Sequence, residues 1–105
     1  MYELILEKIY RLTQDTPLFP KGTKFMHIIA RETEKAWGIS RGLPKHQSKK
    51  LLVFQRRQTV EYKGFVFLKK PTFWLPKSQV TKVGNSLKLP DWLAEKYGLD
   101  LLQPL

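Results

Sequence analysis

Basic and aromatic side chains stand close together in the middle of this chain. Between Lys35 and Lys88 there are thirteen lysine or arginine residues and a single acid, Glu61, whereas the rest of the chain has six bases and eight acids. Positive charge on this scale repels itself and is usually found where a polyanion supplies the opposite charge. Seven aromatic residues lie among the bases, namely Trp37, Phe54, Tyr62, Phe65, Phe67, Phe73 and Trp74. Cations that hold phosphates and rings that stack on bases are the chemistry of a nucleic-acid surface.

Three clusters of bases are candidates for phosphate contacts. The first lies in the segment 40–50, which lacks an apolar pattern and is predicted to be a long functional loop. The second is a pair of arginines in the predicted strand 51–62, and the third is formed by lysines on both sides of Trp74. We expect Trp74 to stack on exposed bases, with Tyr62 or Phe54 as further stacking residues. The predicted nucleic-acid-binding residues are Arg41, Lys45, Lys49, Lys50, Arg56, Arg57, Lys69, Lys70, Trp74 and Lys77.

Each cluster also has a purely structural interpretation. A basic loop keeps a protein in solution, and consecutive arginines protect an edge strand from aggregation. A tryptophan between Phe73 and Leu75 is more often a core residue. In a strand, however, Phe73 and Leu75 share one face and Trp74 takes the other, so a surface aromatic is expected here in either case. Trp37, which stands between Ala36 and Gly38, is predicted to be a core residue.

Residues that support catalysis are scarce. There is no cysteine, the six glycines are spread singly, and the serines lack a nucleophile motif. The two histidines, His27 and His46, have no second metal ligand near them in the sequence. Within the basic region only Glu61 offers a carboxylate for a catalytic metal. The sequence therefore predicts a non-enzymatic protein with no metal site and no cofactor.

The elements that must position these residues are short. With 105 residues the chain is expected to form a single domain. Segment 2–12 fits a strand or a helix, and we favour a strand; 13–23 is predicted to be an irregular loop. Lys63-Gly64 is a predicted tight turn. Further strands are predicted at 25–30, 35–39, 51–62, 65–68, 73–75 and 87–89.

The C-terminal region contains the only predicted helix, from Asp91 to Tyr97. Pro90 precedes it and Gly98 follows it, as is usual at the two ends of a helix. Leu89, Leu93 and Tyr97 recur every four residues and are predicted to be its buried stripe. No secretory signal and no membrane-spanning segment is visible, so we expect a cytoplasmic protein without a membrane partner.

Two segments resemble parts of Src-homology-3-like barrels. Asp15–Phe25, which contains Pro17, Pro20 and Gly-Thr-Lys, is similar to the long first loop of that fold. Trp74-Leu-Pro-Lys-Ser-Gln-Val80 resembles its passage through one helical turn into the last strand. The resemblance implies a mainly β (or α+β) fold, a small Src-homology-3-like or oligonucleotide-binding-like barrel with a short C-terminal helix.

Two further resemblances involve the C-terminal half. Trp74–Val80 and Leu89–Leu99 together are similar to a pattern of small uncharacterised proteins of phage and mobile elements, as is Thr33–Trp37. Lys82–Leu99 resembles the opening of swapped-hairpin antitoxins and transition-state regulators, which are dimeric DNA-binding proteins. Only six residues follow Leu99, so the two strands that complete the swapped-hairpin fold are missing from this chain.

Single-stranded DNA or RNA is the expected partner. No helix is predicted in the basic half that would enter a major groove, which argues against duplex DNA. The alternative is a protein-interaction module, either an adaptor or a phage-type inhibitor of a host complex. The sequence leaves the oligomeric state open.

Overall fold

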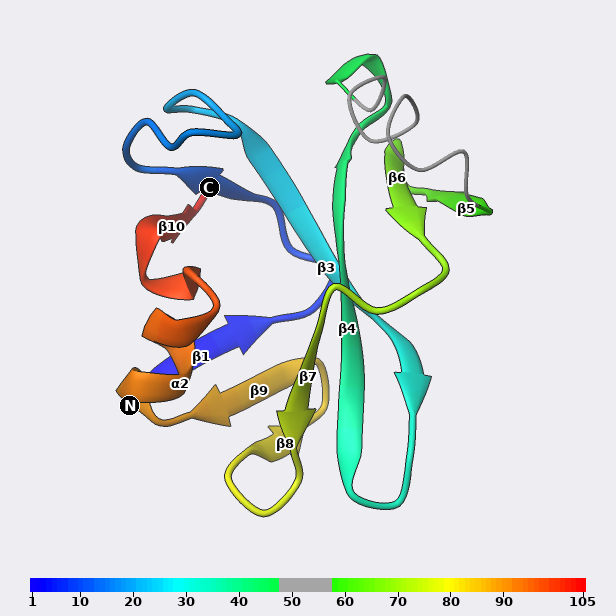
Figure 1. Ribbon diagram of the computed structural model, residues 1–105, viewed down its shortest axis with the longest axis vertical. Coiled ribbons are helices and arrows are strands. Elements are labelled where there is room, and N and C mark those ends of the chain that lie inside the picture. The colour runs from blue at the N-terminus through cyan, green and yellow to red at the C-terminus, as the bar shows by residue number, and fades with distance from the viewer. Residues whose placement is uncertain (48–57) are drawn as a thin grey trace.

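The computed structural model describes residues 1–47 and 58–105 and shows a mainly antiparallel β structure with a short C-terminal helix. Two sheets are present. The smaller sheet has the strand order β1-β9-β8, and the larger has the order β10-β2-β3-β4-β6-β5, with β7 also paired to β4 (Figure 1). Both sheets are open along the strands of the described ranges. The closed barrel expected from the sequence is therefore not confirmed.

The smaller sheet joins residues near the N-terminus to residues 81–89. Strand β1 (Tyr2–Ile5) pairs with β9 (Ser86–Leu89), which forms a hairpin with β8 (Thr81–Val83). Apolar residues alternate along β1 and β9, and Leu4, Leu87 and Leu89 are fully buried. This alternation is the two-residue period of a half-buried strand. The strand interpretation of segment 2–12 is thus confirmed at its two ends, 2–5 and 10–12, whereas a turn with Glu7 at a φ of +64° separates the two strands.

The larger sheet is built on a long hairpin of β3 (Lys24–Glu32) and β4 (Ala36–Pro44). One edge of β4 pairs with β3; the other pairs first with β7 and then with β6, so β4 has three neighbours. The other strands of the larger sheet are short, namely β2 (Tyr10–Leu12), β5 (Thr59–Tyr62), β6 (Phe65–Leu68), β7 (Phe73–Pro76) and β10 (Leu102–Pro104).

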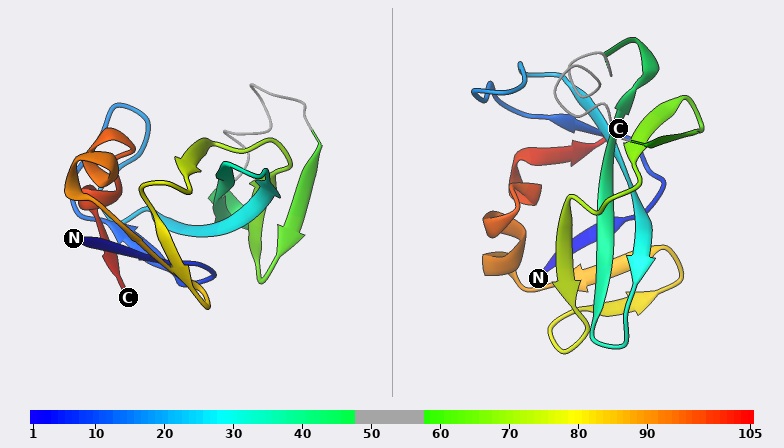
Figure 2. Two further views of the ribbon diagram at one scale, coloured as in Figure 1. Left: turned by 90° about the horizontal axis from the view of Figure 1, so that it is seen from below. Right: turned by 45° about the vertical axis from the view of Figure 1, so that its right-hand side comes forward.

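The main core lies between the two sheets and the C-terminal helix α2 (Asp91–Lys96). Leu93 and Ala94 are buried on α2, and Gly98 adopts the left-handed conformation (φ +70°) that ends it before the 3₁₀ turn η2 (Leu99–Leu101). Figure 2 shows α2 and the β5–β6 hairpin far apart, with the long β3–β4 hairpin between them. A second, small cluster of Met26, Phe65 and Phe67 packs beneath β5–β6.

Most of the predicted elements are present. The helix begins at Asp91 as predicted, and its stripe faces the core, although Tyr97 is only partly buried. Lys63 and Gly64, with φ of +53° and +82°, form the tight turn between β5 and β6. The predicted strand 51–62 is described only from Gln58 onward, where Thr59–Tyr62 is extended.

The predicted loop 40–50 is wrong in its first half. Residues 40–44 continue strand β4, and Lys45–Gln47 form a 3₁₀ turn, η1. The sequence did not indicate a strand here, because glycine, arginine and proline are not typical strand residues. The alternation is nevertheless present: Ile39 and Leu43 are buried in the core, and small residues, Gly38, Ser40 and Gly42, occupy the intervening positions.

Gly42 allows an aromatic ring to lie directly against β4. A Cβ atom at position 42 would come within 2.5 Å of the Phe67 ring. We predict that Gly42→Ala lowers the free energy of unfolding by about 1–3 kcal/mol, as overpacking does elsewhere. Urea denaturation measures the loss, and Phe67→Leu supplies the control. The penalty of Gly42→Ala should shrink in the Phe67→Leu background; an unchanged penalty would contradict the proposed clash.

Candidate functional site

Arg41 has an interior position that the sequence did not indicate. Strand alternation places it between Ile39 and Leu43, on the side of β4 that faces the main core. Its Nε donates a hydrogen bond of 2.9 Å to His27 Nε2, and its Nη2 donates one of 3.0 Å to the carbonyl oxygen of Tyr97. The guanidinium carbon also lies 5.5 Å from the ring centres of both Phe25 and Phe73.

The acceptors around Arg41 are neutral. His27 is completely buried and accepts through Nε2, so its proton resides on Nδ1, which has no hydrogen-bond partner among the described residues. Burial, and secondarily the charge of Arg41, holds the pKa of His27 well below its usual value of 6.5. Burial likewise lowers the pKa of Arg41 to about 10. Within residues 1–47 and 58–105, Arg41 forms no ion pair with a carboxylate.

Two of the predicted phosphate-binding lysines are engaged with acids. Lys77 lies 2.6 Å from a carboxylate oxygen of Glu32 and 5.2 Å from the ring centre of Trp37. Trp37, predicted to be a core residue, is partly buried and packs against the main core. Lys45 is more exposed and lies 3.6 Å from a carboxylate oxygen of Glu61. Ion pairs of this exposed kind are weak, about 0–1 kcal/mol, and a polyanion competes with them. These two lysines therefore contribute less net positive charge than the sequence suggested.

Lys69, Lys70 and Trp74 lie on or beside the connection between β6 and β7. Both lysines are exposed, and neither forms a salt bridge in the part of the chain that the structure describes. Trp74 is 37% exposed, whereas its neighbours Phe73 and Leu75 are buried, as strand alternation predicted. This connection thus carries cations next to an accessible indole ring.

Gly38 allows the Trp74 ring to approach the backbone of β4 closely. A Cβ atom at Gly38 would be 3.0 Å from the Trp74 ring and 2.6 Å from the ring of Pro71. Gly38 also stands opposite Arg31 on β3 and opposite Trp74 on β7. Directly opposite residues share a sheet face, so the exposed Arg31 lies across Gly38 from Trp74. Sequence analysis missed Arg31, because it placed residues 31–34 in a connection, whereas β3 includes Arg31 after a bulge.

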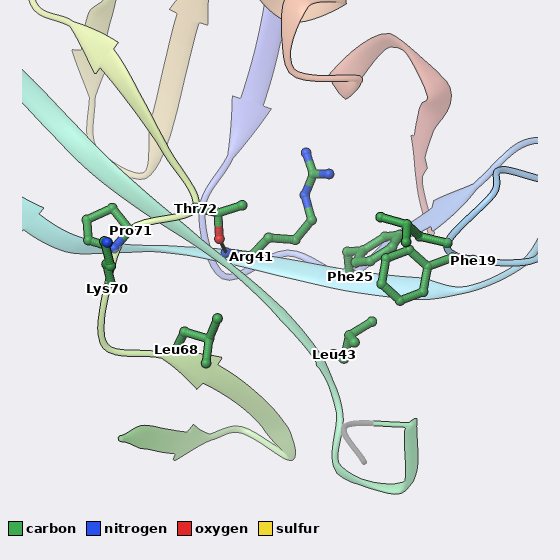
Figure 3. A pocket seen from close by; sticks show the side chains of 9 residues that line it. Phe19, Phe25, Arg41, Leu43, Leu68, Lys70, Pro71 and Thr72 are labelled. Carbon is green, nitrogen blue, oxygen red and sulfur yellow. Dashed lines mark hydrogen bonds between the residues drawn. The ribbon is translucent and has the colours of Figure 1, made fainter. Parts of the chain in front are cut away.

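A pocket opens beside this surface, with a cavity volume of about 460 Å³ (Figure 3). Its apolar walls come from three parts of the chain: Phe19 and Phe25, Leu43, and the segment that includes Leu68 and Pro71. Its polar lining is Arg41, Lys70 and Thr72. In Figure 3 the methylene stem of Arg41 runs between Thr72 and Phe25, and its guanidinium points away from Leu43 and Leu68. No acidic residue of the described ranges lines this pocket.

The other predicted residues are not part of this surface as described. Lys49, Lys50, Phe54, Arg56 and Arg57 fall within 48–57, outside the described residues. Tyr62 is 40% exposed, but its hydroxyl donates a 2.7 Å hydrogen bond to Glu7, whose pKa that bond and Lys63 lower. The Lys63 ammonium group lies 5.4 Å from the Tyr62 ring centre. Tyr62 is thus already held by its neighbours.

Comparisons with known proteins identify no relative. No protein-family model matches the sequence, and neither a curated protein nor a solved structure matches it. The family resemblances of individual segments therefore stay predictions. In the described ranges, no three His, Asp or Glu side chains are grouped as metal ligands, and no helix is long and apolar enough to cross a membrane.

The buried His27 predicts a pH-dependent stability. Its pKa is lowered on folding, so below about pH 6.5 the unfolded chain binds the proton more readily. The free energy of unfolding should fall as the pH is lowered from 7 to 5, with a slope of up to about 1.4 kcal/mol per pH unit. Urea denaturation at each pH measures this slope.

Two substitutions assign the effect. His27→Gln retains an oxygen acceptor for Arg41 but does not titrate, so the slope between pH 7 and 5 should largely disappear. His46→Gln changes the exposed histidine of η1 and should keep the slope. An equal slope in all three proteins would contradict the role of His27.

Proposed function

We propose that this protein binds single-stranded DNA or RNA, without strong sequence preference, through the face of the larger sheet that carries Trp74. This face is called the Trp74 surface and consists of Arg31, Lys69, Lys70, Pro71 and Trp74. The observation that carries the proposal is the exposed indole close to Gly38, with Lys69 and Lys70 before it in the chain and Arg31 across the sheet.

The physical argument is a pairing of two weak interactions. Stacking of a base on an aromatic ring is worth about 1–3 kcal/mol and tolerates any base, because every base has a flat face. Arg31, Lys69 and Lys70 supply charge for the neighbouring phosphates, and each contact releases condensed counterions. Single strands are favoured over duplexes because their bases are accessible for stacking.

The surrounding charge supports the same partner. The region from Lys35 to Lys88 contains one acid, Glu61, which already faces Lys45. Among the predicted cations that the structure describes, Lys77 also faces an acid, Glu32. A polyanion would therefore meet little competing negative charge along this part of the chain. Such binding also agrees with the cytoplasmic location expected from the sequence.

The contribution of stacking is tested with a matched pair of tryptophans. Trp74→Ala should weaken binding of a fluorescent oligothymidylate or oligouridylate about 5-fold or more, the lower end of the stacking energy. Trp92→Ala is the control, since Trp92 is 55% exposed on α2, away from the Trp74 surface. Fluorescence anisotropy at low salt measures both affinities. Equal affinities for the two variants would refute a stacking role of Trp74.

The phosphate contacts are tested by salt titration. For a single strand, each lysine contact contributes about 0.7 to the slope of log K against log salt, so Lys69→Gln/Lys70→Gln should reduce that slope by about 1.4. Lys82→Gln/Lys88→Gln removes the same charge from the smaller sheet and should change the slope less. If the wild-type protein binds neither oligonucleotide at 50 mM salt, the proposal fails. A partner protein bound with little salt dependence would then indicate an interaction module.

A further inference from the structure

The pocket beside the Trp74 surface has the size and walls of an organic ligand site. Its volume of about 460 Å³ falls within the range of about 300–1,000 Å³ of ligand pockets. Phe19 and Phe25 form one wall and Pro71 lies across from them, with Leu43 and Leu68 below in the view of Figure 3. The ring centres of Phe19 and Phe25 are 5.3 Å apart in an edge-to-face arrangement, which is a favourable packing of two aromatic rings. An apolar group of a ligand in this pocket would contact these side chains.

The charged residues at the pocket indicate which chemical group a bound ligand would have beside its apolar ring. Lys70 and Arg41 line it, and the described lining contains no acid. Arg41 contributes its methylene stem to this lining, because its guanidinium is directed away from Leu43 and Leu68 and donates hydrogen bonds to His27 and to the Tyr97 carbonyl oxygen. The exposed Lys70 provides a cation at the surface of the pocket. The arrangement favours a ligand with an apolar ring and an attached anion.

Pro71 connects the pocket with the Trp74 surface. Its ring lines the pocket, and the same ring shares with Trp74 the space above Gly38. A ring in the pocket and a ring on Trp74 would therefore lie on either side of Pro71, with Lys69 and Lys70 preceding Pro71 in the chain. This sequence of ring, anion and ring is the repeat of a nucleic-acid strand. An acidic peptide with an apolar side chain would fill the pocket but would not repeat in this way.

We infer that this pocket receives one base turned out from the bound strand, and that Lys70 holds the adjoining phosphate. The inference rests on the proposed function and adds to it a defined site for a single nucleotide. Stacking on Trp74 can involve any base of a strand that passes over the surface. The pocket instead fixes the strand at one position along its length.

A direct test uses nuclear Overhauser effects between protein and nucleic acid. With a short oligothymidylate bound to the methyl-labelled protein, the thymine methyl group should show contacts to the methyl groups of Leu43 and Leu68 and to the Phe25 ring. Inorganic phosphate alone should leave the methyl chemical shifts of Leu43 and Leu68 unchanged. If the oligonucleotide binds and its base protons contact only the Trp74 side, the pocket inference is refuted while the proposed function stands.

A matched pair of substitutions provides a second readout. Leu18→Glu places a carboxylate at the edge of the pocket on a side chain that is 75% exposed, so the fold is not disturbed. Val83→Glu makes the same charge change at a 63% exposed position on β8. We expect oligothymidylate binding to weaken about 10-fold for Leu18→Glu and about 2-fold for Val83→Glu. Equal losses would refute the inference.

The remaining outcomes also decide between explanations. Failure of every oligonucleotide to bind at low salt removes the proposed function and this inference together. If an acetylated acidic peptide that contains leucine then produces the contacts at Leu43 and Leu68, the pocket is a peptide site and not a nucleotide site.

Discussion

The guanidinium group of Arg41, which lies 5.5 Å from the ring centres of Phe25 and Phe73, connects parts of this protein that are far apart in sequence. Arg41 comes from β4, His27 and Phe25 from β3, Phe73 from β7, and the Tyr97 carbonyl from the end of helix α2. A buried charge without hydrogen-bond partners is very costly, so the two acceptors and the two rings must be assembled together. The negative end of the helix dipole at Tyr97 further favours the cation. The position of α2 against the larger sheet is thus specified by a polar contact as well as by apolar packing.

The two faces of β4 perform different tasks because their side chains differ in size. One face carries Ile39, Arg41 and Leu43, which complete the main core. The other carries Gly38 and Gly42, and the rings of Trp74 and Phe67 approach the backbone there more closely than any Cβ atom would allow. Trp74 is therefore exposed on a paired strand, β7, and not on a loop. Trp74 and Pro71 both occupy the space that a side chain at position 38 would fill.

The sequence was most informative where one period or one turn determines the structure. The helix at Asp91, the turn at Lys63-Gly64 and the outward direction of Trp74 all follow from local rules. Arg41 was assigned to a phosphate site because a base beside Gly42 and Pro44 is typical of an exposed loop. Its interior role depends on His27, Phe73 and Tyr97, which are distant in sequence. Arg31 was missed for a similar reason, since only the register of β3, β4 and β7 brings it to the same face as Trp74.

The pairing of the sheets has a consequence for synthesis of the chain. Strand β1 pairs with β9, and β2 pairs with β10 and β3. During synthesis β1 emerges long before residues 86–89, which supply its partner strand β9. The β3–β4 hairpin, by contrast, closes through neighbouring residues. Contacts of such large sequence separation form slowly, so the protein completes its fold only after most of the polypeptide has been translated. Until then Leu4, Leu6 and Leu12, all buried in the finished protein, stay accessible to chaperones.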